Sequence, residues 1–357
     1  MLKQVLLCLV AFFAMTSGDD DASESAMKVS VDFLRAAMKG NTKNSVISPL
    51  SVSTLLSILQ QGALGNTLTQ LNEALHADAA QSRKLYGRLI RSLKLNFANS
   101  NAAAQEINSW VQKQTHGKVN ELVTPDILGP DTCVMLANAV YFKGIWASPF
   151  NPEKTKDKPF TIAEGQDINV PTMHRKIFTR AGEVPSLGYK WIQLPFEGEQ
   201  YSMYIVLPNK GVALRTTVEQ LAKNEDAFTT IVKSKRRRNV ELALPKFKLS
   251  TQMDLTKTLR SMGINDIFAK ETANLKGISN KPLYVTQVLH QVNLSIDEKG
   301  GTGASSTGVV LQLRSAFDIP SAVLDFTVNR PFLVFIVDKV NISPPLFAGQ
   351  VINPLKS

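Results

Sequence analysis

Residues 300–320 read GGTGASSTGVVLQLRSAFDIP, and residues 326–336, a short way downstream, read FTVNRPFLVFI. The first stretch begins with small residues and carries no charge before Arg314, a composition that favours an exposed loop. Thr307, Val309 and Val310 nevertheless give part of it the propensity of a β-strand. We therefore predict a segment with two states, an exposed loop and an inserted strand.

An arginine in an exposed loop is a cleavage site for trypsin-like proteases, which makes the Arg314–Ser315 bond the predicted target. Leu313 precedes the arginine, a pair that papain-like cysteine proteases also accept, so a second protease class stays open. The segment after Arg314 also leaves room for cleavage after Leu313 or Phe317.

The run at residues 326–336 resembles the C-terminal signature of the serpin family. Residues 44–67 (N-x-V-x-S-P-x-S, then G-A-x-G-x-T) and residues 136–146 (L-x-N-A-x-Y-F-K-G-x-W) are similar to two other serpin segments. The resemblance implies one serpin domain over residues 25–354, with a reactive loop at about 298–325. The expected fold is mixed α+β, with several helices around a large mixed main sheet and two smaller sheets.

The resemblance also implies a mechanism. Seventeen residues run from Glu298 to Arg314 inclusive, which is the serpin spacing between the hinge glutamate and the scissile bond. After cleavage the loop would enter the main sheet as an extra strand, and the acylated protease would be trapped, so the chain is expected to be a suicide inhibitor. The predicted hinge residues are Glu298, Gly300, Gly301, Thr302, Gly303 and Ala304.

Two of the hinge positions differ from the residues that serpins prefer. Serpins prefer threonine and alanine where this chain has Gly301 and Gly303. Each glycine raises the cost of ordering a strand by roughly 0.5–1 kcal/mol relative to alanine. A non-inhibitory, serpin-fold binding protein is therefore the alternative.

A second group of residues is implied at the place where the sheet opens. By the resemblance, Ser48, Ser51, Asn138 and His290 form a hydrogen-bonded cluster beneath the main sheet, and Trp146 caps the point where the loop enters. The four histidines stand in no metal-binding or nucleophile motif, so we expect neither an enzyme nor a metal or cofactor.

One stretch departs from the family. We predict a helix over residues 77–95 and another over 102–123, and serpins have two strands and a helix between the corresponding helices. Those elements need on the order of 25–35 residues. The sequence therefore predicts a deletion near residues 95–101.

The N-terminus predicts export. Lys3 and the apolar run over residues 5–15 are typical of a signal peptide, which we place at residues 1–18, and the run is too short to span a membrane. We expect a secreted, extracellular monomer with no membrane or nucleic-acid partner. Its predicted partner is a trypsin-like serine protease.

The chain is basic, with a formal net charge of +10, which favours anionic partners. The densest basic run, KSKRRR, suggests a sulfated-polysaccharide site, although such runs are more often solvated surface. We expect it at the end of a helix over residues 218–234, followed by a strand over 240–250 and a helix over 251–270. Its residues are Lys233, Lys235, Arg236, Arg237 and Arg238.

Overall fold

The computed structural model describes residues 4–9, 20–86, 93–95, 99–115, 117, 119–128, 134–142, 144–224, 226–301, 323–339 and 345–357. Five predicted site residues, Thr302, Gly303, Ala304, Arg314 and Ser315, lie outside these ranges. The helices of the described ranges are α1 (Asp20–Met38), α2 (Pro49–Gly62), α3 (Gly65–Leu75), α4 (Ala79–Tyr86), α5 (Ser100–Gln114), α6 (Leu214–Lys223), α7 (Ala227–Lys233) and α8 (Thr256–Ser261).

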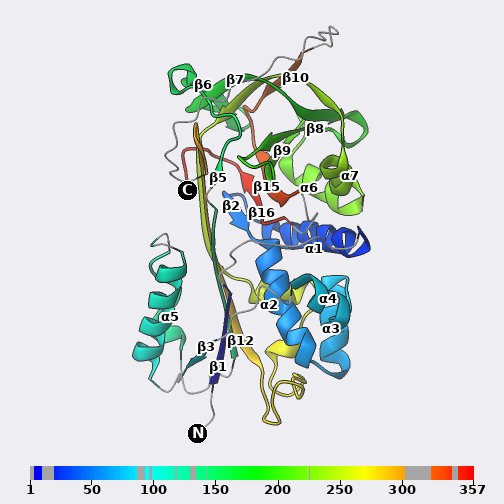
Figure 1. Ribbon diagram of the computed structural model, residues 1–357, viewed down its shortest axis with the longest axis vertical. Coiled ribbons are helices and arrows are strands. Elements are labelled where there is room, and N and C mark those ends of the chain that lie inside the picture. Colours follow the sequence, from blue (N-terminus) through cyan, green and yellow to red (C-terminus); the bar gives the residue numbers. More distant parts are fainter. Residues whose placement is uncertain are drawn as a thin grey trace.

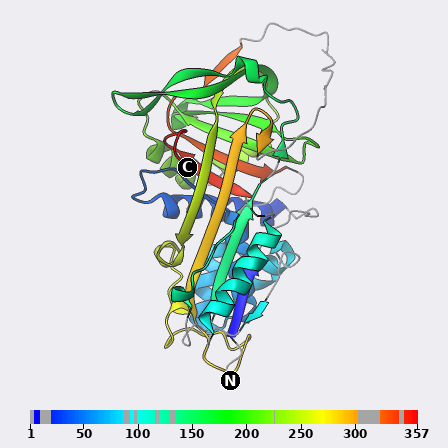
Figure 2. The same ribbon diagram turned by 90° about the vertical axis from the view of Figure 1, so that its left-hand side faces the viewer.

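A long main sheet runs down the molecule, seen edge-on in Figure 1 and face-on in Figure 2. Its long central strands β4 and β12 pair in parallel, and the short β13 pairs antiparallel with β12 and with β5. The strands of this sheet, in spatial order, are β3 (Leu93–Leu95), β1 (Gln4–Leu9), β4 (Val134–Tyr141), β12 (Val285–Asp297), β13 (Gly300–Gly301) and β5 (Gly144–Ile145), and β11 (Phe247–Asp254) also pairs with β12.

The expected two smaller sheets are joined into one nine-stranded network. The 19-residue strand β7 makes the join, because its first part pairs with β6 and β10 and its last residues pair with β8. In spatial order these strands are β14 (Leu324–Thr327), β10 (Arg237–Pro245), β7 (Gln166–Val184), β8 (Tyr189–Pro195), β9 (Tyr201–Pro208), β15 (Phe332–Asp338), β16 (Phe347–Val351) and β2 (Ser45–Ile47), with β6 (Lys156–Ala163) against β7.

Helices cover both faces of the main sheet: α2, α3 and α4 lie on one side and α5 crosses the other (Figures 1 and 2). Helix α2 starts at Pro49 and ends at Gly62, and it is almost wholly buried. Three of its buried hydroxyls donate to the backbone of the preceding turn, for example Thr54 Oγ1 to the Leu50 carbonyl at 2.8 Å. The helix can therefore carry polar side chains beneath the sheet.

Several predicted boundaries are wrong. The helix predicted over 77–95 ends at Tyr86, and strand β3 follows at residues 93–95, so at least one short strand precedes α5 in the stretch expected to have lost two. The helix predicted over 218–234 is two helices, α6 and α7. The strand predicted over 240–250 is two strands, β10 and β11, and β11 also takes the first residues of the helix predicted over 251–270. Pro245, which cannot donate to a ladder, ends the first of those strands.

The N-terminal segment has a place in the sheet. Strand β1 lies between β3 and β4 and pairs with β4 in parallel, although the sequence assigns residues 4–9 to a removable leader. Within the described ranges, no helix is long and apolar enough to cross a membrane.

Candidate functional site

The hinge of the predicted reactive loop is a tight, fully hydrogen-bonded turn at the end of β12. The Asp297 carboxylate accepts from the backbone N–H groups of Lys299 (2.8 Å) and Gly300 (3.2 Å), which closes the turn. Beyond the turn, Gly300 pairs with Asp297 and Gly301 pairs with Ile296. The first residues of the loop are thus already a strand of the main sheet.

Gly300 is required by this turn. Its φ of +136° is in a region that other residues rarely adopt, and a Cβ there would overlap the carbonyl oxygen of Gly144. Gly301 is less constrained, since a Cβ would meet the Phe142 ring at 3.0 Å and the ring would have to shift. The turn therefore requires glycine at position 300, whereas position 301 could accept a side chain if the Phe142 ring shifted.

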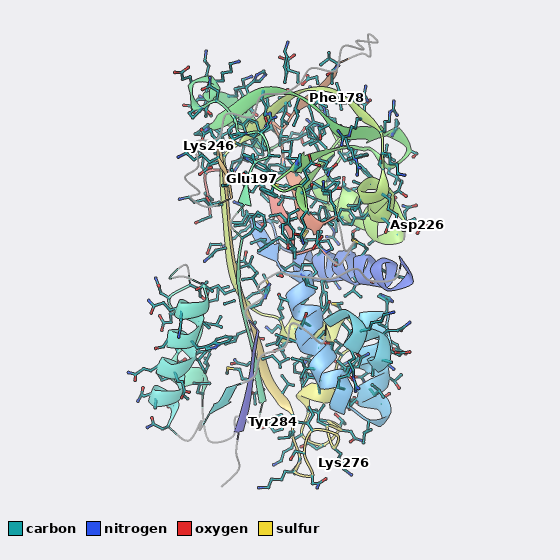
Figure 3. All side chains as sticks on the ribbon, viewed as in Figure 1. Phe178, Glu197, Asp226, Lys246, Lys276 and Tyr284 are labelled. Atoms are coloured by element: carbon teal, nitrogen blue, oxygen red, sulfur yellow. The ribbon has the colours of Figure 1, made fainter. Side chains whose placement is uncertain are left out.

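Glu298 anchors the turn to neighbouring segments. One carboxylate oxygen lies 3.0 Å from Lys246 Nζ, and the other accepts from Thr155 Oγ1 at 2.8 Å. Desolvation raises the pKa of this carboxyl, but hydrogen bonds from its own backbone N–H, from Lys246 and from Thr155 outweigh it and leave the pKa lowered. Lys246 lies at the upper end of the main sheet in Figure 3.

Trp146 holds the other side of the hinge. Its backbone N–H donates to the Lys299 carbonyl and its indole Nε1 to the Asp297 carbonyl, both at 2.9 Å. The buried ring stacks on Phe196, with centroids 4.6 Å apart. The structure therefore brings Trp146 into contact with the hinge, whereas Ser48 and His290 contact each other.

Ser48, Ser51 and His290 meet beneath the sheet, and all three are fully buried. The Ser48 backbone N–H donates to His290 Nε2 at 2.9 Å, so the neutral ring carries its proton on Nδ1. Burial lowers the pKa of His290 to about 3, in accord with a neutral imidazole. Asn138 is directly opposite His290 in the β4–β12 pairing, although its side chain is not described. The histidine thus ties the start of α2 to β12, one of the two strands that must separate if the sheet opens.

The gap into which a strand would insert is closed. Strands β4 and β12 are paired directly, from Val134 opposite Val285 to Tyr141 opposite Asn293. Only at the upper end does β13 separate β12 from β5, which follows β4 in the chain. In the described ranges the first two residues of the loop, Gly300 and Gly301, pair as a strand, and below them β4 and β12 pair directly.

The basic run is divided among different surroundings. It spans the end of α7 and the start of β10, with Lys233, Lys235, Arg236 and Arg237 exposed. The half-buried Arg238 instead lies 3.8 Å from Glu183. Sequence reasoning missed this division because it depends on strand alternation at the first residues of β10.

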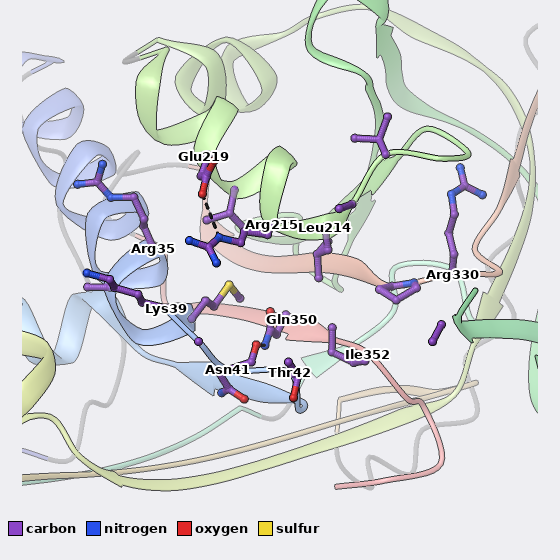
Figure 4. A pocket seen from close by; sticks show the side chains of 18 of the residues that line it. Arg35, Lys39, Asn41, Thr42, Leu214, Arg215, Glu219, Arg330, Gln350 and Ile352 are labelled. Carbon is purple, nitrogen blue, oxygen red and sulfur yellow. Dashed lines mark hydrogen bonds and ion pairs between the residues drawn. The ribbon is translucent and has the colours of Figure 1, made fainter. Parts of the chain in front are cut away.

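A separate cavity of about 1390 Å³ lies between α1 and α6 (Figure 4). Its lining combines apolar residues such as Leu214 and Ile352 with the cations Arg35 and Lys39. Arg215, on the same wall, is paired with Glu219 at 3.0 Å. No motif in the sequence pointed to this cavity, because its residues come from segments far apart in the chain.

Comparison with protein families finds one match. The family model described as "Serpin (serine protease inhibitor)" matches residues 24–95 and 81–354 in two overlapping pieces. The two pieces overlap at residues 81–95, just before the predicted deletion.

Individual relatives agree. Alaserpin from Manduca sexta is 34% identical over 279 residues, which cover 77% of this chain and 68% of alaserpin. Among solved structures, Manduca sexta serpin-12 has a TM-score of 0.79 at 27% identity, covering 93% of this chain and 99% of that one. Native protease nexin-1 with heparin has a TM-score of 0.78 at 26% identity, covering 94% and 99%.

Proposed function

The chain belongs to the serpin family, and from that premise we propose that it is a secreted suicide inhibitor of trypsin-like serine proteases, cleaved at Arg314–Ser315. The protease would take the Arg314 guanidinium into an acidic specificity pocket and form an acyl-enzyme with its carbonyl. Insertion of the freed loop would then displace the protease before hydrolysis is complete. Loss of even one oxyanion donor slows such hydrolysis by about 10²–10³.

The register of β13 is the observation that carries this proposal. In the β12–β13 hairpin Ile296 faces Gly301 and Asp297 faces Gly300. Each step back along β12 therefore pairs with one step forward along the loop. If the hairpin is extended in this register, Val285, the first residue of β12, would face Gln312. Strand β12 is thus long enough to pair the loop up to two residues before the proposed scissile bond.

The same register predicts which side chains would be buried. Along β12, Val288, His290, Val292, Leu294 and Ile296 point into the core. Residues that face each other across a ladder share a side of the sheet. The loop residues expected on the buried side are Gly301, Gly303, Ser305, Thr307 and Val309.

All of these residues are small or β-branched, so they suit a narrow buried space between packed layers. An inserted strand would form hydrogen-bond ladders with both β4 and β12, which now pair directly with each other at this point. These gains would drive insertion of the loop as an added strand.

The direct test mixes the mature protein with trypsin and follows the products by denaturing gel and intact mass. We expect a covalent complex and a released peptide that begins at Ser315. Clean cleavage without complex would reject inhibition but keep the cleavage site, and a peptide beginning elsewhere would reject Arg314. Papain in a parallel reaction distinguishes the cross-class alternative, since only that alternative requires a stable papain complex.

The cavity between α1 and α6 favours a second candidate, a non-inhibitory carrier. At about 1390 Å³ with mixed apolar and charged walls, it is large enough for a small organic molecule. Native mass spectrometry of protein purified without detergent would reveal a retained ligand. An empty cavity, together with a covalent trypsin complex, would reject the carrier hypothesis.

We also propose a sulfated polysaccharide as a partner. Its support is the net charge of +10 and the exposed basic run at the end of α7. The heparin in the nexin-1 structure belongs to that protein and makes heparin a reasonable first probe here.

A further inference from the structure

A small pocket at the junction of the two halves of the nine-stranded sheet collects positive charge. It has a volume of about 250 Å³ and lies between β7, β10 and the segment around Ser148. Four cationic residues line it, Arg175, Arg180, Arg237 and Lys339, against one acid, Glu199. This size suits one small anionic group better than a drug-sized ligand.

Like charges are placed together here at a cost. Arg180 of β7 and Arg237 of β10 are directly opposite each other in the antiparallel ladder, an arrangement that destabilises a sheet. In the described part of the chain neither forms an ion pair. An anion bound between them would remove the repulsion.

The other two cations are held by different contacts. The Lys339 backbone N–H donates to the Gln200 carbonyl at 2.8 Å, which positions the main chain there. The lysine pKa is lowered mainly by desolvation and also by Arg180 and Arg237, although nearby Glu199 raises it. The Arg175 guanidinium donates to the Ser148 carbonyl and lies 5.2 Å from the centre of the Phe150 ring. The Arg175 side of the pocket is therefore preformed, which reduces the entropy lost on binding.

An aromatic ring stands at the rim. Phe178 also lines the pocket, yet 59% of it is exposed, which is unusual for so large an apolar side chain. Figure 3 places it at the upper end of the molecule. Its face is open to the organic part of a ligand whose anionic group enters the pocket.

We propose that this pocket binds a tetrahedral oxyanion group, and specifically a sulfate ester on a sulfated polysaccharide. Arginine suits such groups because its planar fork can donate two parallel hydrogen bonds. The choice of a polysaccharide as the source of the anion rests on the partner proposed above. The oxyanion site itself does not, and neither depends on protease inhibition. Of the basic run, only Arg237 lines the pocket, so Lys233, Lys235 and Arg236 would add no more than general attraction.

Isothermal titration calorimetry of the full chain tests the proposal with two probes, inorganic phosphate and a fully sulfated heparin disaccharide. Arg180→Gln and Lys339→Gln each remove a pocket cation, and Arg238→Gln is the matched control because Arg238 pairs with Glu183 outside the pocket. Circular dichroism establishes that each variant is folded. Ionic strength is held constant with chloride so that screening does not differ between titrations.

We expect the disaccharide to bind the wild type, to lose about tenfold or more in affinity in each pocket variant, and to keep its affinity in Arg238→Gln. Phosphate binding with the same pattern would show that the oxyanion alone suffices and that a polysaccharide source is not required. No binding of either probe to the wild type, or equal losses in the pocket variants and the control, would overturn the proposal.

Discussion

Replacing Thr307 by arginine tests the insertion register most directly. In the register set by β13, residue 307 faces His290, whose side chain is fully buried against α2. An inserted arginine would therefore be buried without a partner carboxylate. The effective cost of burying an unpaired charge is several kcal/mol.

This cost translates into a measurable change in trapping. We take the cost of burying the arginine as ~3 kcal/mol. If about half of this cost is present in the transition state for insertion, the loop inserts roughly tenfold more slowly. Deacylation of the protease is not changed, so the ratio of cleaved, released inhibitor to covalent complex rises roughly tenfold. The assay titrates a fixed amount of trypsin and measures both residual activity and covalent complex on a gel.

Ser306→Arg is the matched control, since it adds the same charge to the same loop one residue away. In the same register it faces Gln291, which is only half-buried and lies on the α5 side of the sheet. Trapping should fall much less in this variant. Equal loss in the two variants, or wild-type trapping by Thr307→Arg, would refute the register.

Other predictions concern the hinge, the buried histidine and the N-terminus. Because the folded pKa of His290 is about 3, below its unfolded value of 6.5, its contribution to stability is complete above pH 6.5 and falls as the pH drops towards 3. We expect about 2 kcal/mol to be lost at pH 5 in urea unfolding, and most of this loss to be absent in His290→Gln. Gly300→Ala should cost about 2 kcal/mol or more in the same assay, since it adds a steric overlap to an unusual φ, whereas Gly165→Ala, at positive φ but in open space, should cost less. Gly303→Ala should raise the yield of trypsin complex if hinge ordering limits insertion, and an unchanged yield would remove the glycine argument. Protein secreted from a eukaryotic host should have an intact mass that lacks residues 1–18, and full-length protein in the medium would contradict the predicted leader.

Local patterns predicted the elements on which the site is built. Proline in a first helical turn and glycine after an apolar run are local signals, and Pro49 and Gly62 stand at the two ends of α2. The apolar run through Leu136 forms β4. Trp146 was expected where the loop enters, and it contacts the hinge there through Lys299 and Asp297. Such signals depend only on residues close together in the chain, so they can be recognised in a single sequence.

What the sequence did not predict depends on pairing between distant strands. Arg180 and Arg237 are 57 positions apart, and only the register of β7 against β10 brings them face to face. Lys339 reaches the same pocket from the end of β15. The sequence shows that the basic run exists. Only the fold shows that Arg237 lines a pocket, that Arg238 pairs with Glu183 and that the other residues face solvent.

None of the contacts described for the hinge and the buried cluster involves the N-terminal strand β1. If residues 1–18 are removed, β4 loses its parallel neighbour β1 but keeps its whole pairing with β12. The hinge contacts of Glu298 and Trp146 all involve residues after position 144, and the buried cluster begins at Ser48. Losing β1 would free one edge of β4, so β4 would be less firmly held and easier to separate from β12. Removal of the leader would therefore favour insertion of the loop, which makes the mature form the one in which trapping should be measured.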